Sequence, residues 1–289
     1  MTKTILITGA NGQLGSTIQK LASHYPDYRF YFTDIETLDI LEKELISDFV
    51  RTNQIQYIVN CAAYTAVDKA EDNADLAMQI NCDAVRNIGE VAKAYHANVI
   101  HISTDYVFDG TGNRPYREDD PINPTSVYGS TKLAGEHILQ QICPESVIIR
   151  TAWLYSEYGT NFVKTMIRLG KERSDLNVVS DQIGTPTYAG DLAEAIIAIL
   201  NHSVFTPGIY HYSNEGICSW YDFASAIIKQ AQLDCRVHPI PTKDYPTPAK
   251  RPAYSVLDKT KIKQVYGITI PEWETSLERC LQYLQLTMH

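Results

Sequence analysis

A tyrosine and a lysine four positions apart are the strongest candidates for chemistry in this sequence of 289 residues. Tyr128 and Lys132 stand at i and i+4 in a helix-like stretch, which places both side chains on one helix face. A phenol with its ordinary pKa of about 10 exchanges protons poorly at neutral pH. A nearby ammonium would lower that pKa and make Tyr128 a usable acid and base. The expected third member is a hydroxyl group, and Ser103 and Thr104 follow the apolar run Val99–Ile102. The alternative for the pair is an ordinary surface helix.

A glycine-rich turn near the N-terminus predicts a phosphate-binding loop. Its glycines have the spacing G-x-x-G-x-x-G between a strand-like run and a helix that begins near Gly12. Glycine lets the backbone turn tightly and approach a pyrophosphate, and a helix N-terminus offers unpaired N–H groups to it. No G-K-S or G-K-T follows, which excludes a P-loop. An ordinary glycine-rich connection is the alternative. The predicted loop comprises Gly9, Ala10, Asn11, Gly12, Gln13, Leu14 and Gly15.

Asp34 is the candidate for contact with the ribose of a dinucleotide. It lies 19 positions after Gly15, just beyond a second strand-like run. A carboxylate there accepts hydrogen bonds from ribose hydroxyls and repels a 2′-phosphate. No lysine or arginine follows before Lys43, so NADH is favoured over NADPH. A turn or capping role for Asp34 is the alternative, and use of both cofactors stays open.

The elements that must position these groups form a βαβα pattern in the N-terminal half. The strands are apolar throughout, which predicts a parallel sheet buried on both faces. We therefore expect an α/β fold: a Rossmann-type doubly wound parallel sheet with a smaller C-terminal substrate-binding domain. The expected strands are Ile5–Ile7, Phe30–Thr33, Tyr57–Asn60, Val99–Ser103 and Val147–Thr151, and the expected helices are Gln13–Ser23, Leu41–Arg51, Ala74–Tyr95 and Val127–Gln141.

The second half has a looser pattern. We predict a cofactor-binding domain over residues 1–152, to which later segments return, and a mainly substrate-binding domain over 153–289. The proline-rich segment Pro239–Pro252 cannot be a helix or a central strand and is expected to be a functional loop. Further helices are expected at Asn161–Gly170, Ala189–Leu200, Trp220–Ala231 and Glu274–Leu284.

Composition excludes several classes of protein. The formal charge is 25 − 34 = −9, so no broad basic surface for nucleic acid is expected. No apolar run approaches the roughly 18 residues that a membrane span needs. The six cysteines are scattered, which argues against a zinc site or a disulfide framework. The histidines show no ligand spacing and are interpreted as packing or surface residues, and no metal is expected. Without a signal peptide, a cytoplasmic location is predicted.

Taken together, the motifs resemble those of the extended short-chain dehydrogenases/reductases, and within them the dTDP-4-dehydrorhamnose reductases. The resemblance extends from residue 4 to residue 258. It rests on the glycine loop, on Tyr128-x-x-x-Lys132 and on five further blocks. These blocks are Asn60-Cys61-Ala62-Ala63-Tyr64-Thr65-Ala66-Val67-Asp68, Ser103-Thr104-Asp105-Tyr106-Val107-Phe108-Asp109-Gly110, Arg150-Thr151-Ala152-Trp153-Leu154-Tyr155, Asp181-Gln182-x-Gly184-x-Pro186-Thr187 and Arg251-Pro252-x-x-Ser255-x-Leu257-Asp258.

This resemblance implies an NADH- or NADPH-dependent reduction of the C4 keto group of dTDP-4-dehydro-β-L-rhamnose to dTDP-L-rhamnose, in dTDP-rhamnose biosynthesis. It implies that Tyr128 protonates the C4 oxygen, that Thr104 hydrogen-bonds the same oxygen and that Lys132 holds ribose. The implied cofactor contacts beyond the glycine loop and Asp34 are Asp39, Ile40, Ala62, Ala63 and Tyr64. The implied substrate contacts are Val67, Thr104, Asp105, Tyr128, Trp153, Asn161 and Arg251. A homodimer is possible.

Bland alternatives exist for several of these residues. Trp153 could be a core aromatic, Asp105 a turn cap, and Asn161 and Arg251 capping or surface residues. Asn81 resembles a helix asparagine of the family for which a structural role is expected.

Two other functions compete with reduction. Another epimerase or reductase of the superfamily needs only the tyrosine–lysine pair and a cofactor, whereas a 4,6-dehydratase needs a carboxylate where this chain has Tyr106. A non-catalytic subunit like the regulatory subunit of methionine adenosyltransferase shares the fold. It is disfavoured because Thr104, Tyr128 and Lys132 are all present.

Overall fold

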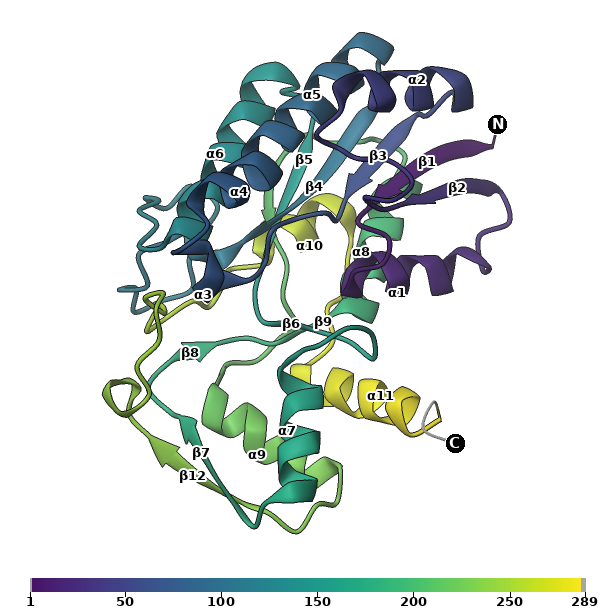
Figure 1. Cartoon of the computed structure of the whole chain (residues 1–289). Coiled ribbons are helices and arrows are strands. Elements are labelled where there is room, and N and C mark those ends of the chain that lie inside the picture. The colour runs from purple at the N-terminus through teal and green to yellow at the C-terminus, as the bar shows by residue number, and fades with distance from the viewer. Residues whose placement is uncertain (1, 287–289) are drawn as a thin grey trace.

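A six-stranded, fully parallel sheet forms the centre of the molecule. The computed structural model describes residues 2–286 (Figure 1). The strand order is β2-β1-β3-β4-β5-β10, so the chain runs outward from β1 to β2 and then crosses to β3 on the other side. In such sheets ligands bind beyond the carboxyl ends of the strands, where the order reverses. The strands are β1 (Lys3–Thr8), β2 (Tyr28–Thr33), β3 (Tyr57–Asn60), β4 (Asn98–Thr104), β5 (Val147–Thr151) and β10 (Gly208–His211).

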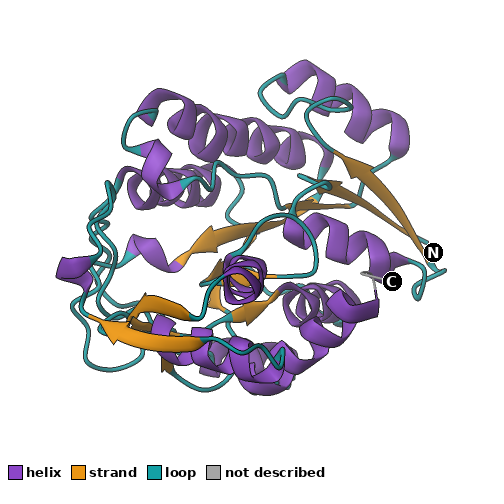
Figure 2. Ribbon diagram, turned by 60° about the horizontal axis from the view of Figure 1, so that its bottom comes forward, coloured by secondary structure: helices purple, strands orange, loops and turns teal. Residues whose placement is uncertain are grey.

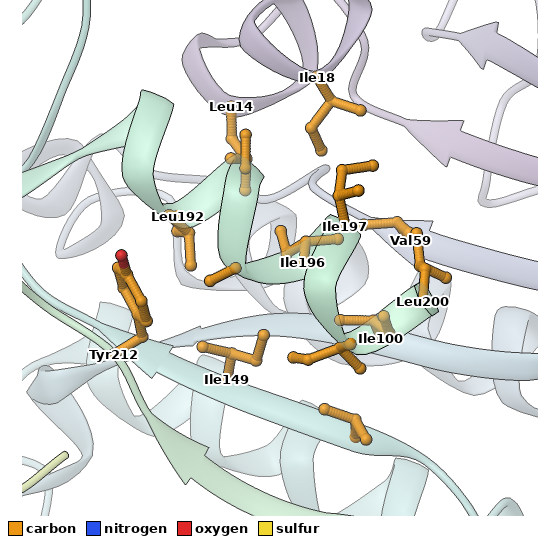
Figure 3. Close-up of a cluster of buried hydrophobic side chains, with 14 of the residues drawn as sticks. Leu14, Ile18, Val59, Ile100, Ile149, Leu192, Ile196, Ile197, Leu200 and Tyr212 are labelled. Atoms are coloured by element: carbon orange, nitrogen blue, oxygen red, sulfur yellow. The ribbon is translucent and has the colours of Figure 1, made fainter. Parts of the chain in front are cut away.

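Helices cover both faces of this sheet (Figure 2). Successive strand residues point to opposite faces, so Ile5 and Ile7 join one buried cluster while Leu6 joins the other. The first face carries α1 (Gln13–Ala22), α8 (Ala189–Asn201) and α10 (Thr260–Tyr266), and the second carries α2 (Lys43–Asn53), α5 (Ala84–Tyr95) and α6 (Val127–Ile142). Figure 3 shows Leu14 and Ile18 of α1 beside the leucines and isoleucines of α8, above Ile100 and Ile149 of the strands. The predicted doubly wound α/β fold is confirmed.

A third buried cluster lies beyond the carboxyl edge of the sheet, around Phe223, Trp273 and Leu277. It is built by α7 (Phe162–Glu172), β7 (Asp175–Val179), α9 (Trp220–Gln230), β12 (Arg236–Ile240) and α11 (Trp273–Leu286). Two short strand pairs, β6 (Leu154–Tyr155) with β9 (Thr187–Tyr188) and β8 (Ile183–Gly184) with β11 (Cys218–Ser219), lie between it and the sheet (Figure 1).

The expected helix Ala74–Tyr95 is interrupted. It consists of α4 (Ala74–Met78), a π-helical segment η1 (Gln79–Asp83) and α5. A π turn inserts an extra residue into the helix and turns a side chain away from its regular face. Here the segment carries Asn81, which is fully buried.

The proline-rich segment begins as a strand, which the sequence did not predict. Pro239 and Ile240 end β12, which pairs in parallel with β7 alone. Arg236 donates its backbone N–H to Ser174, and the Ile240 carbonyl accepts from Ser180. Alternate residues therefore face β7, and the nitrogen of Pro239 points away from it, where a missing N–H costs nothing. The short segment η3 (Thr242–Asp244) follows.

Two global expectations can be compared with the structure. No helix within residues 2–286 is both long and apolar enough to span a membrane. All six cysteines are free thiols.

Candidate active site

The glycine-rich loop follows β1 at the point where the strand order reverses. Gly9 has φ +63°, and a Cβ there would lie 2.7 Å from the Ala62 backbone. A Cβ at Gly15 would lie 2.4 Å from the Gly9 carbonyl oxygen. Gly12 is the N-cap of α1 and supplies no side chain to cap its N–H groups. Backbone therefore packs against backbone around an uncapped helix N-terminus, an arrangement that fits the pyrophosphate of a dinucleotide.

Asp34 braces this loop from the end of β2. Its Oδ2 accepts from the Asn11 backbone N–H at 2.8 Å, and its Oδ1 accepts from the N–H of Ile35 at 2.9 Å. The turn role named as an alternative is therefore real, and the half-buried carboxylate also lies beside the predicted phosphate loop. Asp39 accepts from the Leu41 N–H at 2.9 Å and, with Ile40, shapes the turn before α2.

Two buried asparagines fix the backbone of the segment that follows β3. Asn60 Oδ1 accepts from the Ala62 N–H at 3.1 Å. Asn81 bonds both backbone groups of Tyr64, accepting from its N–H at 2.9 Å and donating to its carbonyl at 3.2 Å. This is the structural role expected for Asn81. These bonds hold the segment 62–64, which includes Ala63, at the same edge of the sheet as the glycine loop.

Tyr128 lies in the first turn of α6, which starts at the N-cap Ser126. The helix approaches η2 (Asp105–Val107) closely, because a Cβ at Gly129 would lie 2.3 Å from the Tyr106 carbonyl oxygen. The Tyr106 and Tyr128 rings meet edge to face at 5.4 Å. The Thr104 side chain at the end of β4 lies near enough to the Tyr128 phenol to lower its pKa. The predicted tyrosine and threonine are thus brought together.

Burial raises the pKa of the Tyr128 phenol, and Asp105 and Tyr106 add to that shift, while the hydrogen bond with Thr104 opposes it. Lys132 is not among the groups that move this pKa. Its Nζ instead donates to the Ile102 carbonyl at 2.7 Å and lies 3.4 Å from His101 Nε2. The expectation that Lys132 lowers the pKa of Tyr128 is therefore wrong for this geometry, because the amine points at β4.

Lys132 itself is 1% exposed. Burial lowers its pKa to about 8, against the opposing effects of Glu136 and Cys61. A larger fraction of Lys132 is therefore neutral near pH 7 than of an exposed lysine.

Asp105 combines burial with an unused acceptor. It is 2% exposed, and burial raises its pKa to about 6 against the opposing hydrogen bonds of Ser255 and Thr104. Its Oδ2 has no hydrogen-bond partner within residues 2–286. The capping role suggested for Asp105 belongs to Thr104, whose Oγ1 accepts from the Tyr106 N–H at 3.2 Å and caps η2. An unpaired buried acceptor beside Tyr128 is suited to a substrate hydroxyl.

Trp153 has φ +48°, an outlying conformation for a bulky residue. Its ring stacks on Trp220 at 3.6 Å with a 12° interplanar angle, and a Cβ at Gly184 would lie 2.7 Å from it. The Trp153 side chain is only half buried. It therefore packs in an aromatic cluster and also leaves part of its surface accessible.

Two of the predicted nucleotide contacts already have structural partners. Asn161 caps α7 by accepting from the Lys164 N–H at 3.1 Å, and its Nδ2 donates to Gln13 Oε1 at 2.9 Å. Arg251 donates to Asp68 Oδ2 at 2.6 Å. Val67 begins α3 (Val67–Ala70) next to that aspartate.

The sequence did not identify a row of three polar side chains as part of the site. Thr8, Asn60 and His101 are register partners on the adjacent strands β1, β3 and β4. Thr8 Oγ1 donates to Asn60 Oδ1 at 2.7 Å, and Asn60 Nδ2 lies 3.0 Å from His101 Nδ1. His101, interpreted from the sequence as packing or surface, links this row to Lys132. The polar residues that interrupt or end the apolar runs of these three strands were the available signal.

No group of three or more His, Cys, Asp or Glu side chains in the described chain is placed to hold a metal ion.

Comparison with known proteins gives the family. The model of the RmlD substrate binding domain family matches residues 2–286. A dTDP-4-dehydrorhamnose reductase of Aggregatibacter actinomycetemcomitans is 43% identical, over 97% of this chain and 99% of the relative. The spore coat polysaccharide biosynthesis protein SpsK of Bacillus subtilis is 41% identical over 98% of both chains.

Solved structures agree with this result. A dTDP-4-dehydrorhamnose reductase of Bacillus anthracis in complex with NADP has a TM-score of 0.93 and 40% identity, covering 98% of this chain and all of that one (100%). The corresponding structure from Clostridium acetobutylicum has a TM-score of 0.94 and 44% identity, covering 98% and 99%. The chain therefore belongs to the dTDP-4-dehydrorhamnose reductase family.

Proposed function

We propose that this protein reduces the C4 keto group of dTDP-4-dehydro-β-L-rhamnose to dTDP-L-rhamnose with NADH or NADPH. The names of its relatives supply the substrate, and the Bacillus anthracis structure holds NADP. The observation that carries the proposal is the meeting of Tyr128, Thr104 and the unpaired oxygen of Asp105 at the end of β4.

Reduction of a ketone requires a hydride at carbon and a proton at oxygen. A bound nicotinamide dinucleotide supplies the hydride. Burial keeps the Tyr128 phenol protonated, so its O–H is available for donation to the C4 oxygen. The Thr104 hydroxyl can stabilise the resulting phenolate by a hydrogen bond. Lys132 lies one helical turn further along α6, where it can hold the nicotinamide ribose.

The substrate contacts follow from the same geometry. The free oxygen of Asp105 is suited to accept from a sugar hydroxyl, and the Trp153 ring offers a face for the sugar. Arg251 and Asn161 would contact the diphosphate, and Val67 would lie near the thymidine. Binding would then recruit groups that are now paired with Asp68 and Gln13.

The test is loss of absorbance at the reduced-nicotinamide band, with purified protein, either cofactor and dTDP-4-dehydro-β-L-rhamnose made in situ. We expect oxidation that depends on the keto sugar and yields dTDP-L-rhamnose. The faster cofactor tests the preference for NADH that Asp34 predicts. A protein that binds NADH but oxidises neither cofactor in the presence of the sugar would overturn the proposal.

A cytoplasmic location and a homodimer remain predictions. Sedimentation of the purified chain tests the second.

A further inference from the structure

The row of polar side chains that ends at Lys132 fixes the tautomer of a buried histidine. Asn60 Oδ1 faces two groups, the Ala62 backbone N–H at 3.1 Å and the Thr8 hydroxyl at 2.7 Å. A backbone N–H can only donate, so the oxygen of the Asn60 amide must point to it, and the Nδ2 group must point to His101.

This orientation determines where His101 carries its proton. Asn60 Nδ2 is a donor only and lies 3.0 Å from His101 Nδ1, so Nδ1 must accept. His101 is fully buried, and burial together with Lys132 lowers its pKa well below the usual 6.5, so the ring is neutral. A neutral ring with an accepting Nδ1 carries its hydrogen on Nε2. That N–H faces Lys132 Nζ at 3.4 Å.

A ring N–H is an unsuitable neighbour for an ammonium group. An ammonium has three donors and no acceptor, whereas a neutral amine has a lone pair that can accept from Nε2–H. Lys132 Nζ donates one hydrogen to the Ile102 carbonyl at 2.7 Å, and this bond does not use its remaining hydrogens. The distance of 3.4 Å is longer than the roughly 2.7–3.2 Å of an ordinary hydrogen bond, so Lys132 Nζ and His101 Nε2 face one another without a short bond between them.

We propose that His101 is a positioning residue whose Nε2–H, directed by Asn60, favours the neutral amine of Lys132 and so sets how tightly Lys132 holds its third proton. The inference concerns this site in the proposed reductase. Its first tests use no sugar, and their outcome is therefore independent of the substrate assigned above.

The other groups around Lys132 do not provide this control. Glu136, one turn along α6, favours the ammonium, but Arg150 at 2.7 Å and Ser103 already occupy its oxygens. Burial raises the pKa of the Cys61 thiol to about 12, so it is neutral. Tyr128 on the same helix face is a protonated phenol. His101 is thus the neighbour that can change, because its tautomer decides whether Nε2 presents an N–H or a lone pair to Lys132 Nζ.

The first experiment reads the tautomer directly. In protein labelled with ¹⁵N-histidine, long-range ¹H–¹⁵N correlation distinguishes a ring protonated on Nε2 from one protonated on Nδ1. The His101 signals are assigned by their absence from His101→Phe or, if that variant does not fold, from His101→Gln. We expect the Nε2–H form from pH 6 to 9. A ring protonated on Nδ1, or on both nitrogens, overturns the proposal.

The second experiment reverses the tautomer. Asn60→Asp is nearly isosteric, and the new carboxylate still accepts from Thr8 and Ala62 but cannot donate to His101. The ring should move its proton to Nδ1 and present a lone pair to Lys132. The titration midpoint of Lys132, followed by the ¹³Cε shift of the lysine signal that Lys132→Met lacks, should rise by about one pH unit or more. An unchanged midpoint contradicts the proposal.

Two controls separate this effect from charge and from general disturbance. Thr8→Val removes one bond to Asn60 but leaves the Ala62 N–H on Oδ1, so the His101 tautomer should not change. The new carboxylate alone also favours the ammonium, so Asn60→Asp is repeated in the His101→Phe or His101→Gln background. If Lys132 shifts as much there as in Asn60→Asp alone, His101 is not the intermediary.

The functional readout is the pH dependence of NADH binding, measured by nicotinamide fluorescence. If charged Lys132 holds the ribose, affinity falls as pH rises through the Lys132 midpoint. That fall should move to higher pH in Asn60→Asp by the same shift as the ¹³C titration. A fall that stays in place while the lysine signal moves shows that Lys132 does not control binding.

Discussion

At the scale of single residues, burial decides what the site can do. The sequence indicated Tyr128, Lys132 and Thr104 from their types and spacing, but spacing cannot state a protonation state. The structure raises the pKa of Tyr128 and lowers that of Lys132, because both groups are removed from water. The sequence predicted that the Lys132 ammonium lies beside the Tyr128 phenol. That prediction depended on the direction of Lys132 Nζ, which the i, i+4 spacing does not determine.

Tyr128→Phe tests the proton donor. The variant keeps the ring that packs against Tyr106 and loses only the hydroxyl. We expect NADH binding to persist and kcat to fall by about 10²–10⁴-fold, the usual contribution of a general acid. Fluorescence titration and the absorbance assay separate the two effects. Near-normal turnover would remove Tyr128 from its assigned role.

Asp34→Ala tests cofactor choice. Loss of the carboxylate removes the predicted repulsion of a 2′-phosphate, so the ratio of kcat/KM for NADH over NADPH should drop by about tenfold. Because Asp34 also accepts from the Asn11 N–H, affinity for both cofactors should weaken. Equal losses for the two cofactors would mean that Asp34 supports the loop without selecting between them.

Asp105→Asn tests the cost of the unpaired acceptor. The folded-state pKa of about 6 lies above the ordinary 3.8, so ionisation opposes folding and this cost grows as pH rises from about 4 to 6. The variant should be more stable than the parent at pH 8, by on the order of 2 kcal/mol, and no more stable below pH 4. Urea unfolding at both pH values measures this.

A control with the opposite sign is Asp109→Asn. Hydrogen bonds from Thr111 lower the pKa of the half-buried Asp109, so its replacement should destabilise at pH 8. If both variants lose stability at pH 8, burial of Asp105 carries no cost.

At the scale of elements, apolar runs predicted the strands β1 to β5 to within a few residues. The burial of β1, β3, β4 and β5 followed from a parallel sheet, whereas the edge strand β2 is only half buried. The order of the strands was not readable, because it depends on which helix crosses which face. The return of β10 to the sheet edge is set by contacts far apart in sequence. The π segment was missed because helical periodicity over Ala74–Tyr95 conceals one inserted residue.

Paired glycine substitutions test that segment. A Cβ at Gly135 in α6 would lie 2.1 Å from the Asn81 carbonyl oxygen, which is backbone and cannot move freely. A Cβ at Gly89 in α5 would meet side chains and no backbone, the end of Leu139 at 3.1 Å and Ile142 at 3.6 Å. We expect Gly135→Ala to cost about 1–3 kcal/mol and Gly89→Ala to be close to neutral, since alanine favours a helix. Equal urea midpoints for the two variants would show that α6 does not need this approach.

At the scale of the whole molecule, polar contacts at the site join segments around the parallel sheet to segments beyond its carboxyl edge. Gln13 of the phosphate loop meets Asn161, the N-cap of α7, and Ser156, which follows β6. Asp68 meets Arg251. These contacts join segments more than 140 positions apart, so no local pattern predicts them. They bring the predicted cofactor loop into direct contact with Asn161, one of the predicted substrate residues.

Buried neutral histidines make the stability of the whole molecule depend on pH. Burial lowers the pKa of His211 to about 3 and that of His101 well below 6.5. The unfolded chain takes up these protons below about pH 6.5 while the folded chain resists them, so stability is full above that pH and is lost as pH falls. Each histidine contributes about 1.4 kcal/mol per pH unit. Asp105, whose pKa is raised to about 6, acts in the opposite direction between about pH 6 and 4.

His211→Asn isolates one of these contributions. His211 lies 3.0 Å from the Tyr116 carbonyl through Nδ1, a contact that an asparagine amide can replace, while its Nε2 has no partner within residues 2–286. The free energy of unfolding in urea at pH 7.5, 6 and 5 should fall less steeply in the variant, by about 1.4 kcal/mol for each pH unit below 6.5. Parallel curves for parent and variant would mean that His211 is protonated in the folded chain. His101, whose neutral ring the proposed control of Lys132 requires, would then be the remaining buried histidine with a lowered pKa in the described chain.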